Sequence, residues 1–194
     1  MSWGAISADE ALQIAIVLWY ILALVWLVLW FGMKRAKKSE TPWERAQHIL
    51  PVMAAFWLLF ERQWPALGAR LFAESPGILW AGVLVTGLGV GIGMWARLSL
   101  GTNWSGMVTL KKDHELIRTG LYRWIRHPIY TGILAGFLGT ELILGHARGL
   151  LGFVILWLSF YFKARREENF LRQEFGEGFE EHARRTGMFL PKLT

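Results

Sequence analysis

Five apolar blocks, separated by polar or basic connections, account for most of the chain. The clearest block runs from about Leu12 to Phe31 and contains no charged residue. A helix needs roughly 20 apolar residues to cross the hydrocarbon core of a bilayer, and soluble domains rarely contain such blocks. The composition agrees, since 54% of the residues are apolar and only 19% are charged. The chain is therefore predicted to be an all-α, polytopic membrane helix bundle.

The other four blocks are shorter than the first. They run from about Ile49 to Phe60, Ile78 to Trp95, Ile129 to Leu144 and Leu150 to Phe162. We expect one membrane domain over residues 1–194, with three spans in 1–98 and a catalytic core with two spans in 99–194. The second block is short for a crossing, so it needs flanking residues or a tilt. The last two blocks predict a helical hairpin around Gly145 and Gly149.

Basic residues indicate the orientation, because short loops rich in Lys and Arg stay in the cytoplasm. Of the 21 Lys and Arg residues, all but Arg62, Arg70 and Arg148 follow the first, third or fifth block. This distribution predicts five spans with the N-terminus outside and the polar connections inside. The net charge of +6 is explained by anionic lipid headgroups, since no nucleic-acid-binding motif accompanies it.

The residues before the first block predict that this block is retained. They include Asp9 and Glu10, where a signal peptide would carry basic residues. The chain has no cysteine, which excludes disulfides, a thiolate nucleophile and a cysteine-based zinc site. We predict no metal site, and the oligomeric state stays open.

The third block contains two Gly-x-x-x-Gly pairs, Gly87 with Gly91 and Gly89 with Gly93. Such pairs let membrane helices approach closely, so we expect them at a helix interface. A dinucleotide fingerprint would need glycine at position 92, which is Ile92. The glycines therefore predict packing rather than nucleotide binding.

Polar chemistry is confined to two places, the connection from Ser99 to Trp124 and the tail after Phe162. Pro128 suits the first turn of a helix and holds the preceding residue, His127, in an extended conformation. The start of that helix would favour a negative group such as a ligand carboxylate.

In the tail, Lys163 and Glu167 are four residues apart, so they share one helix face and could flank one cavity.

Several motifs in the last half of the chain form a specific combination. They are Gly120-x-Tyr122, Arg126-His127-Pro128-x-Tyr130-x-Gly132, Gly139-Thr140, Glu167-Glu168, Phe175-Gly176 and Phe189-x-Pro191. Over residues 105–194 this combination resembles the isoprenylcysteine carboxyl methyltransferase family. The resemblance implies an all-helical membrane bundle with a cytoplasmic pocket for S-adenosylmethionine.

The resemblance also implies roles for individual residues. Cofactor binding carries over to His114, Glu115, Leu116, Ile117, Tyr122, His127, Pro128, Ile129, Tyr130 and Glu167. The family binds the acceptor carboxylate through an arginine, and Lys163 stands at that position, with Arg165 and Arg166 nearby. Met107 stands where the family has a cofactor-contacting glutamine, so only a backbone contact carries over there.

The function implied is methyl transfer from S-adenosylmethionine to the carboxylate of a lipophilic acceptor, such as a C-terminal isoprenylcysteine. The acceptor would be a small molecule or a prenylated protein that enters from the bilayer. One alternative is a lipid-amine methyltransferase, which would need a base such as His127 or Glu168. Another is a transporter, although transporters carry ionisable residues along their spans.

Other interpretations of the same residues stay open from sequence alone. Glu167 and Glu168 could be solvated partners of the neighbouring arginines. Tyr122 and Tyr130 could belong to an interfacial aromatic belt while also binding the cofactor. Glu141, the one acid within a span, is expected to be structural. Residues 169–185 predict an amphipathic segment that lies on the membrane or caps the pocket, broken at Gly176 and Gly178.

Overall fold

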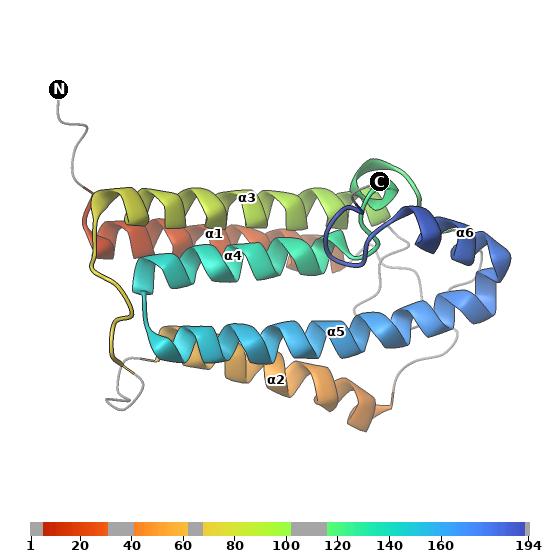
Figure 1. The fold of residues 1–194 in the computed structure, drawn as a ribbon, viewed down its shortest axis with the longest axis horizontal. Coiled ribbons are helices and arrows are strands. Elements are labelled where there is room, and N and C mark those ends of the chain that lie inside the picture. The colour runs from red at the N-terminus through yellow and green to blue at the C-terminus, as the bar shows by residue number, and fades with distance from the viewer. Residues whose placement is uncertain (1–5, 31–40, 62–67, 102–115, 193–194) are drawn as a thin grey trace.

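The computed structural model describes residues 6–30, 41–61, 68–101 and 116–192. Its elements are α1 (Ala8–Trp30), α2 (Pro42–Phe60), α3 (Pro76–Leu100), the short 3-10 helix η3 (Gly120–Arg123), α4 (Pro128–Leu144), α5 (Ala147–Phe175) and α6 (Glu177–Arg185). The helices α1 to α5 lie side by side and alternate in direction, while α5 projects beyond the bundle toward α6 (Figure 1). Within the described residues the elements are all helical, which confirms the predicted fold class.

Three of these helices, α1, α3 and α5, are long and apolar enough to cross a membrane. The helix α4 is apolar but shorter, with 17 residues, and α2 has 19 residues and begins with charged Glu44 and Arg45. The chain is thus a helical membrane protein. The count of five spans and their orientation stay predictions.

The helix α2 begins well before the apolar block that predicted it. Thr41 accepts a hydrogen bond from the amide of Glu44 while the Glu44 side chain accepts one from the amide of Thr41, which forms a complete capping box. Pro42 then occupies the first helical position, where its missing N–H costs nothing. The early start adds a polar turn that carries Gln47 and His48 to the end of the bundle.

The helix α5 is continuous where the sequence predicted a span ending near Phe162 and a separate amphipathic segment. Residues 163–175 contain no proline or glycine, so nothing interrupts the helix. Gly176 ends it with a φ of 51°, a conformation that glycine adopts at little cost, whereas Gly178 lies inside α6 and breaks nothing. The interval after α4 is also shorter than predicted, because Gly149 already lies within α5.

The helices α3 and α4 pack through glycines on both sides. A Cβ atom built at Gly89 would lie 2.2 Å from the amide nitrogen of Gly136. A Cβ atom at Gly139 would lie 2.3 Å from the amide nitrogen of Thr86. Only a hydrogen fits at these positions, so the two backbones can approach closely.

Of the two predicted glycine pairs, only the pair Gly89 and Gly93 belongs to this interface. Gly132 of α4 lies against Gly93, so that a Cβ at Gly132 would be 2.5 Å from the Gly93 amide nitrogen. A Cβ at Gly91 would meet nothing within 4 Å, and one at Gly87 would only touch Leu18 of α1. The pair Gly87 and Gly91 therefore does not serve the packing of α3 against α4.

The helix α2 packs against α5 and continues the bundle on that side (Figure 1). Ala55 and Leu59 of α2 form a buried cluster with Leu156 and Phe160 of α5. At the far end of α5, the apolar side of α6 turns toward the protein and buries Phe179. The predicted amphipathic helix thus caps the end of the bundle.

Candidate active site

The Arg126-His127-Pro128 run is held in place by the C-terminal segment. The amide of Arg126 donates to the carbonyl of Gly187 at 2.9 Å, and the amide of His127 donates to that of Met188 at 3.0 Å. The hydroxyl of Thr131 donates to the carbonyl of Phe189 at 2.6 Å. These bonds fix the start of α4 beside the C-terminal segment that follows α6 (Figure 1).

Glu168 of α5 is buried and compensated by several cationic groups. Its Oε1 atom accepts a 2.7 Å hydrogen bond from Nε of Arg126 and lies 3.3 Å from Nε2 of His127. Its Oε2 atom lies 3.6 Å from a guanidinium nitrogen of Arg172. The side chain is only 1% exposed, so the interpretation of Glu168 as part of a solvated charge run is wrong. A buried carboxylate paired in this way holds its partners in position.

Glu167, the next residue, faces the first turn of α4. The Tyr130 hydroxyl donates a 2.7 Å hydrogen bond to Oε1 of Glu167, and Nδ1 of His127 lies 3.4 Å from Oε2. The Glu167 side chain is 21% exposed, so its carboxylate is accessible as well as paired. His127 therefore lies between two adjacent carboxylates from one helix.

This position sets the charge of His127. Burial by itself would lower the pKa of the imidazole, but hydrogen bonds and charge attraction from Glu167 and Glu168 outweigh it and raise the pKa above its usual value. Both ring nitrogens face carboxylate oxygens, and only the imidazolium form donates from both. The two carboxylates therefore favour the imidazolium form of His127, which argues against its use as a general base.

Aromatic rings form one wall of the site. The ring of Tyr130 stacks with that of His127, at 5.5 Å between ring centres, and with that of Phe160 of α5, at 4.6 Å. Phe189 from the tail meets Tyr130 at 6.5 Å. The ammonium of Lys163 lies 5.9 Å from the centre of the Tyr130 ring, within the range of a cation–π contact.

Of the site residues predicted from sequence, four come together here. They are His127, Tyr130, Lys163 and Glu167. Pro128 is buried at the start of α4, as its place in the first turn predicts.

A second group of predicted residues lies against α3. Tyr122 is buried and its hydroxyl donates to the Ala96 carbonyl at 3.4 Å. Ile129 packs with both, and Ile117 is partly buried against them. These side chains pack between the start of α4 and the end of α3. Leu116 is half-buried nearby in sequence, and the remaining predictions, His114, Glu115 and Met107, lie outside the described residues.

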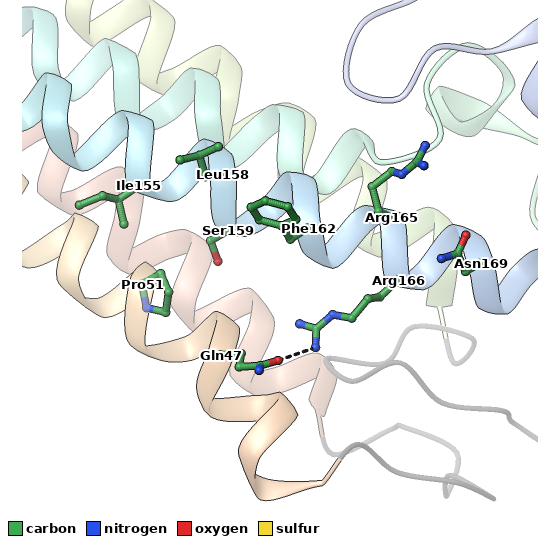
Figure 2. Close-up of a pocket in the computed structure, with 9 residues that line it drawn as sticks. All are labelled: Gln47, Pro51, Ile155, Leu158, Ser159, Phe162, Arg165, Arg166 and Asn169. Carbon is green, nitrogen blue, oxygen red and sulfur yellow. Dashed lines mark hydrogen bonds between the residues drawn. The ribbon is translucent and has the colours of Figure 1, made fainter.

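A groove between α2 and α5 runs along the membrane part of the bundle to this end. Its volume is about 600 Å³. It is lined by Gln47, Pro51, Ile155, Leu158, Ser159, Phe162, Arg165, Arg166 and Asn169. Apolar side chains line one end and polar ones the other (Figure 2). Such a surface suits an amphiphile that has an apolar chain and a polar head.

Arg165 and Arg166, the two arginines predicted to act with Lys163, line this groove. Arg166 donates a 3.1 Å hydrogen bond to Oε1 of Gln47, and the Arg165 side chain is directed away from it (Figure 2). Lys163 itself turns toward α2 and α4, where Nε2 of His48 lies 3.4 Å from its ammonium. Arg165 and Arg166 therefore line the groove, whereas Lys163 contacts Tyr130 next to the glutamate cluster, which comprises Glu167 and Glu168 with Arg126 and His127.

Sequence reasoning missed two contributors to this arrangement. Arg126 was visible in the Arg-His-Pro motif, but nothing in the sequence indicated its distant partner Glu168. His48 gave no motif at all, because it lies at the edge of an apolar block with no matching pattern. A start signal for α2 was present in Thr41 and Glu44 and could have drawn attention to the polar turn after them.

Comparisons with known proteins identify the class. A model of the phospholipid methyltransferase family matches residues 78–178, about half of the chain. A solved structure of the eukaryotic intramembrane Ras methyltransferase, an isoprenylcysteine carboxyl methyltransferase, superposes with a TM-score of 0.57 at 25% identity. The match covers 75% of this chain and 52% of that one. Fold and site together therefore define a membrane methyltransferase.

Curated relatives narrow the class. A probable protein-S-isoprenylcysteine O-methyltransferase of Oryza sativa subsp. japonica is 30% identical over 143 residues, which cover 72% of this chain and 75% of the relative. The protein-S-isoprenylcysteine O-methyltransferase of Saccharomyces cerevisiae is 35% identical over 99 residues, 50% of this chain and 41% of that protein. The chain belongs to the isoprenylcysteine carboxyl methyltransferase family.

Proposed function

We propose that this enzyme transfers a methyl group from S-adenosylmethionine to the free carboxylate of a prenylated cysteine, on a protein or a small molecule. The observation that carries the proposal is the position of Lys163. Its buried ammonium lies 5.9 Å from the centre of the Tyr130 ring and 3.4 Å from Nε2 of His48 on α2. Its neighbours on α5 line the groove, whose polar end carries Arg165 and Arg166. A cation at the polar end of such a groove suits an anionic amphiphile.

The residues of the glutamate cluster fit the cofactor. S-adenosylmethionine carries an ammonium and a carboxylate, and when bound it supplies an electrophilic methyl group. The partly exposed carboxylate of Glu167 suits the ammonium end, and the start of α4 suits the carboxylate. His127, Tyr130 and the residues around Ile129 would then shape the cofactor pocket.

The acceptor requires little chemical activation. A carboxylate is already ionised at neutral pH, so the reaction needs no general base, in keeping with the cationic His127. Lys163, with Arg165 or Arg166 at the groove, would orient the carboxylate along the transfer axis. The burial of Lys163 excludes water from the reacting oxygen. Positioning within about 3–3.5 Å is the main contribution that the protein makes.

The groove would accept the prenyl chain from the bilayer. Ile155, Leu158 and Phe162 provide apolar contacts along α5, in the part of the helix predicted to span the membrane. With the N-terminus outside, the cluster at the opposite end of α1 faces the cytoplasm, where the cofactor is dissolved. A polar cofactor from the cytoplasm and a lipophilic acceptor from the bilayer could thus reach the same site.

The charge of Lys163 gives the test. Lys163→Met removes the charge and keeps most of the stem, so we expect the acceptor KM to rise at least about tenfold. Lys163→Arg keeps the charge and restores the residue that the family carries, so it should retain near-normal KM. Both variants should bind S-adenosylhomocysteine like the wild type. Equal acceptor KM values in all three proteins would contradict the proposed role of Lys163.

A further inference from the structure

The helix α2 contributes a residue to the acceptor side of the site. His48 is buried, and its imidazole Nε2 atom lies 3.4 Å from the Lys163 ammonium on α5. The backbone carbonyl of the same residue accepts a 3.3 Å hydrogen bond from the Ser159 hydroxyl, one turn earlier on α5. His48 therefore contacts α5 through both its side chain, at Lys163, and its backbone carbonyl, at Ser159. The phospholipid methyltransferase model matches residues 78–178 and does not include α2.

The donor and acceptor rules fix how His48 contacts Lys163. An ammonium has only donors, so the imidazole Nε2 atom must accept and the ring must be neutral with its proton on Nδ1. The Lys163 charge disfavours a second proton on the same ring. An ammonium has three N–H donors, which makes a contact with His48 compatible with carboxylate binding.

A neutral acceptor has a specific advantage over a carboxylate at this place. Asp or Glu at the position of His48 would pair directly with Lys163 and compete with the acceptor's carboxylate for it. Glu167, one turn along α5, is already paired with Tyr130 and His127. Imidazole accepts a hydrogen bond but leaves the positive charge intact. The hydrogen bond to imidazole also restricts the lysine side chain, which has four rotatable bonds. This restriction matters more for lysine than for arginine, because the planar guanidinium already has a preferred orientation and the ammonium does not.

We infer that His48 is a positioning residue, which aims the Lys163 ammonium at the acceptor's carboxylate without neutralising it. The inference rests on the proposed function of Lys163. It gives α2 a role in acceptor recognition in addition to its packing against α5. The ammonium of Lys163 then contacts both the Tyr130 ring of α4 and the His48 ring of α2.

Three substitutions separate this role from simple packing. His48→Gln can present an oxygen acceptor near the place of Nε2, so it should keep the acceptor KM within about twofold of wild type. His48→Leu fills the space without an acceptor and should raise the KM at least about fivefold. His48→Glu should raise the KM more than His48→Leu, because it pairs with Lys163. The affinity for S-adenosylhomocysteine, measured by calorimetry, should not change in any of them.

Two controls keep the test specific. Leu59→Ala disturbs the buried contact between α2 and α5 away from Lys163, so it should lower the melting temperature without changing the acceptor KM. In a Lys163→Met background, His48→Leu should have no further effect on the KM, since its target is gone.

The outcomes distinguish this inference from the function on which it rests. If wild-type protein does not methylate a prenylcysteine, the proposed function fails before any variant is compared. If wild type is active and His48→Leu keeps a normal KM, the positioning role is wrong. The role is also wrong if His48→Gln is as impaired as His48→Leu, or if the Lys163→Met background leaves the effect of His48→Leu in place.

Discussion

The hydroxyl of Tyr130 donates a 2.7 Å hydrogen bond to Oε1 of Glu167, which connects the first turn of α4 to α5. The adjacent Glu168 turns instead toward Arg126 and is almost completely buried. Two neighbouring carboxylates on one helix therefore have different surroundings. The partly exposed Glu167 suits a ligand, and the buried Glu168 holds the start of α4 in place.

This difference predicts separate effects of two conservative substitutions. Glu167→Gln should weaken S-adenosylhomocysteine binding roughly tenfold or more, because it removes a charge-assisted hydrogen bond worth about 1.5–3 kcal/mol. Glu168→Gln should lower the free energy of unfolding by about 1–3 kcal/mol, because Arg126 and His127 lose a buried charged partner. Calorimetry gives the first quantity and thermal unfolding in detergent the second.

Each variant serves as the control for the other. Unchanged affinity and unchanged melting temperature in both would mean that the glutamates are a solvated face with no role in the site. A larger loss of affinity in Glu168→Gln than in Glu167→Gln would reverse the assignment of the cofactor contact.

The glycine interface allows a matched comparison within α3. Gly89→Ala places a Cβ 2.2 Å from a backbone nitrogen of α4, so it must push the helices apart and should cost at least about 1–3 kcal/mol. Gly91→Ala enters open space and gains helix propensity, so its stability should be unchanged or up to about 1 kcal/mol higher. Thermal unfolding of the two purified variants decides. Equal stabilities would mean that α3 and α4 are not packed through Gly89.

The charge of His127 predicts a pH dependence. Its pKa is raised in the folded protein, so the stabilisation is complete at pH values below the unfolded pKa of about 6.5. As the pH rises through the folded pKa, the imidazolium loses its proton and this stabilisation is lost. The melting temperature of the wild type should therefore fall with rising pH in that range.

His127→Gln supplies the control, since it removes the titrating group and keeps a hydrogen-bonding side chain. Its melting temperature should be lower near pH 6 and should depend less on pH. An identical pH profile in both proteins would show that His127 is not the titrating group.

The orientation can be tested with single cysteines because the chain contains none. Glu74→Cys lies on an exposed side chain before α3, and Ser39→Cys lies in the first basic connection. An impermeant thiol reagent added to intact cells should label the cysteine at 74 and spare the one at 39. The reverse pattern would move the glutamate cluster to the outside and contradict a cytoplasmic active site.

Much of the fold could be predicted because it depends on local patterns. The lengths of the apolar blocks predicted a helix bundle, and Pro128 marked the residue at which α4 begins. Helix ends were harder where no proline or glycine marked them, which is why the unbroken stretch from Lys163 to Phe175 was divided in two. The choice between two overlapping glycine pairs depended on the face that α4 occupies, which the sequence of α3 alone does not contain.

The site was predictable where family motifs covered it and not elsewhere. His127, Tyr130 and Glu167 were placed by motif, and the structure brings them together. The partner of Arg126 and the neighbour of Lys163 are separated from them by 42 and 115 residues, so only the packing of α2, α4 and α5 reveals them. Long-range pairs of this kind leave no local pattern.

The central claim is that the enzyme methylates a carboxylate. The direct measurement is transfer of a radiolabelled methyl group from S-adenosylmethionine by purified protein, with farnesylcysteine and phosphatidylethanolamine offered as separate acceptors. A carboxyl methyltransferase should give a farnesylcysteine product whose label is released by mild base, as a methyl ester requires, and no labelled phosphatidylethanolamine. Base-stable label on phosphatidylethanolamine, with none on farnesylcysteine, would contradict it and identify a lipid-amine methyltransferase.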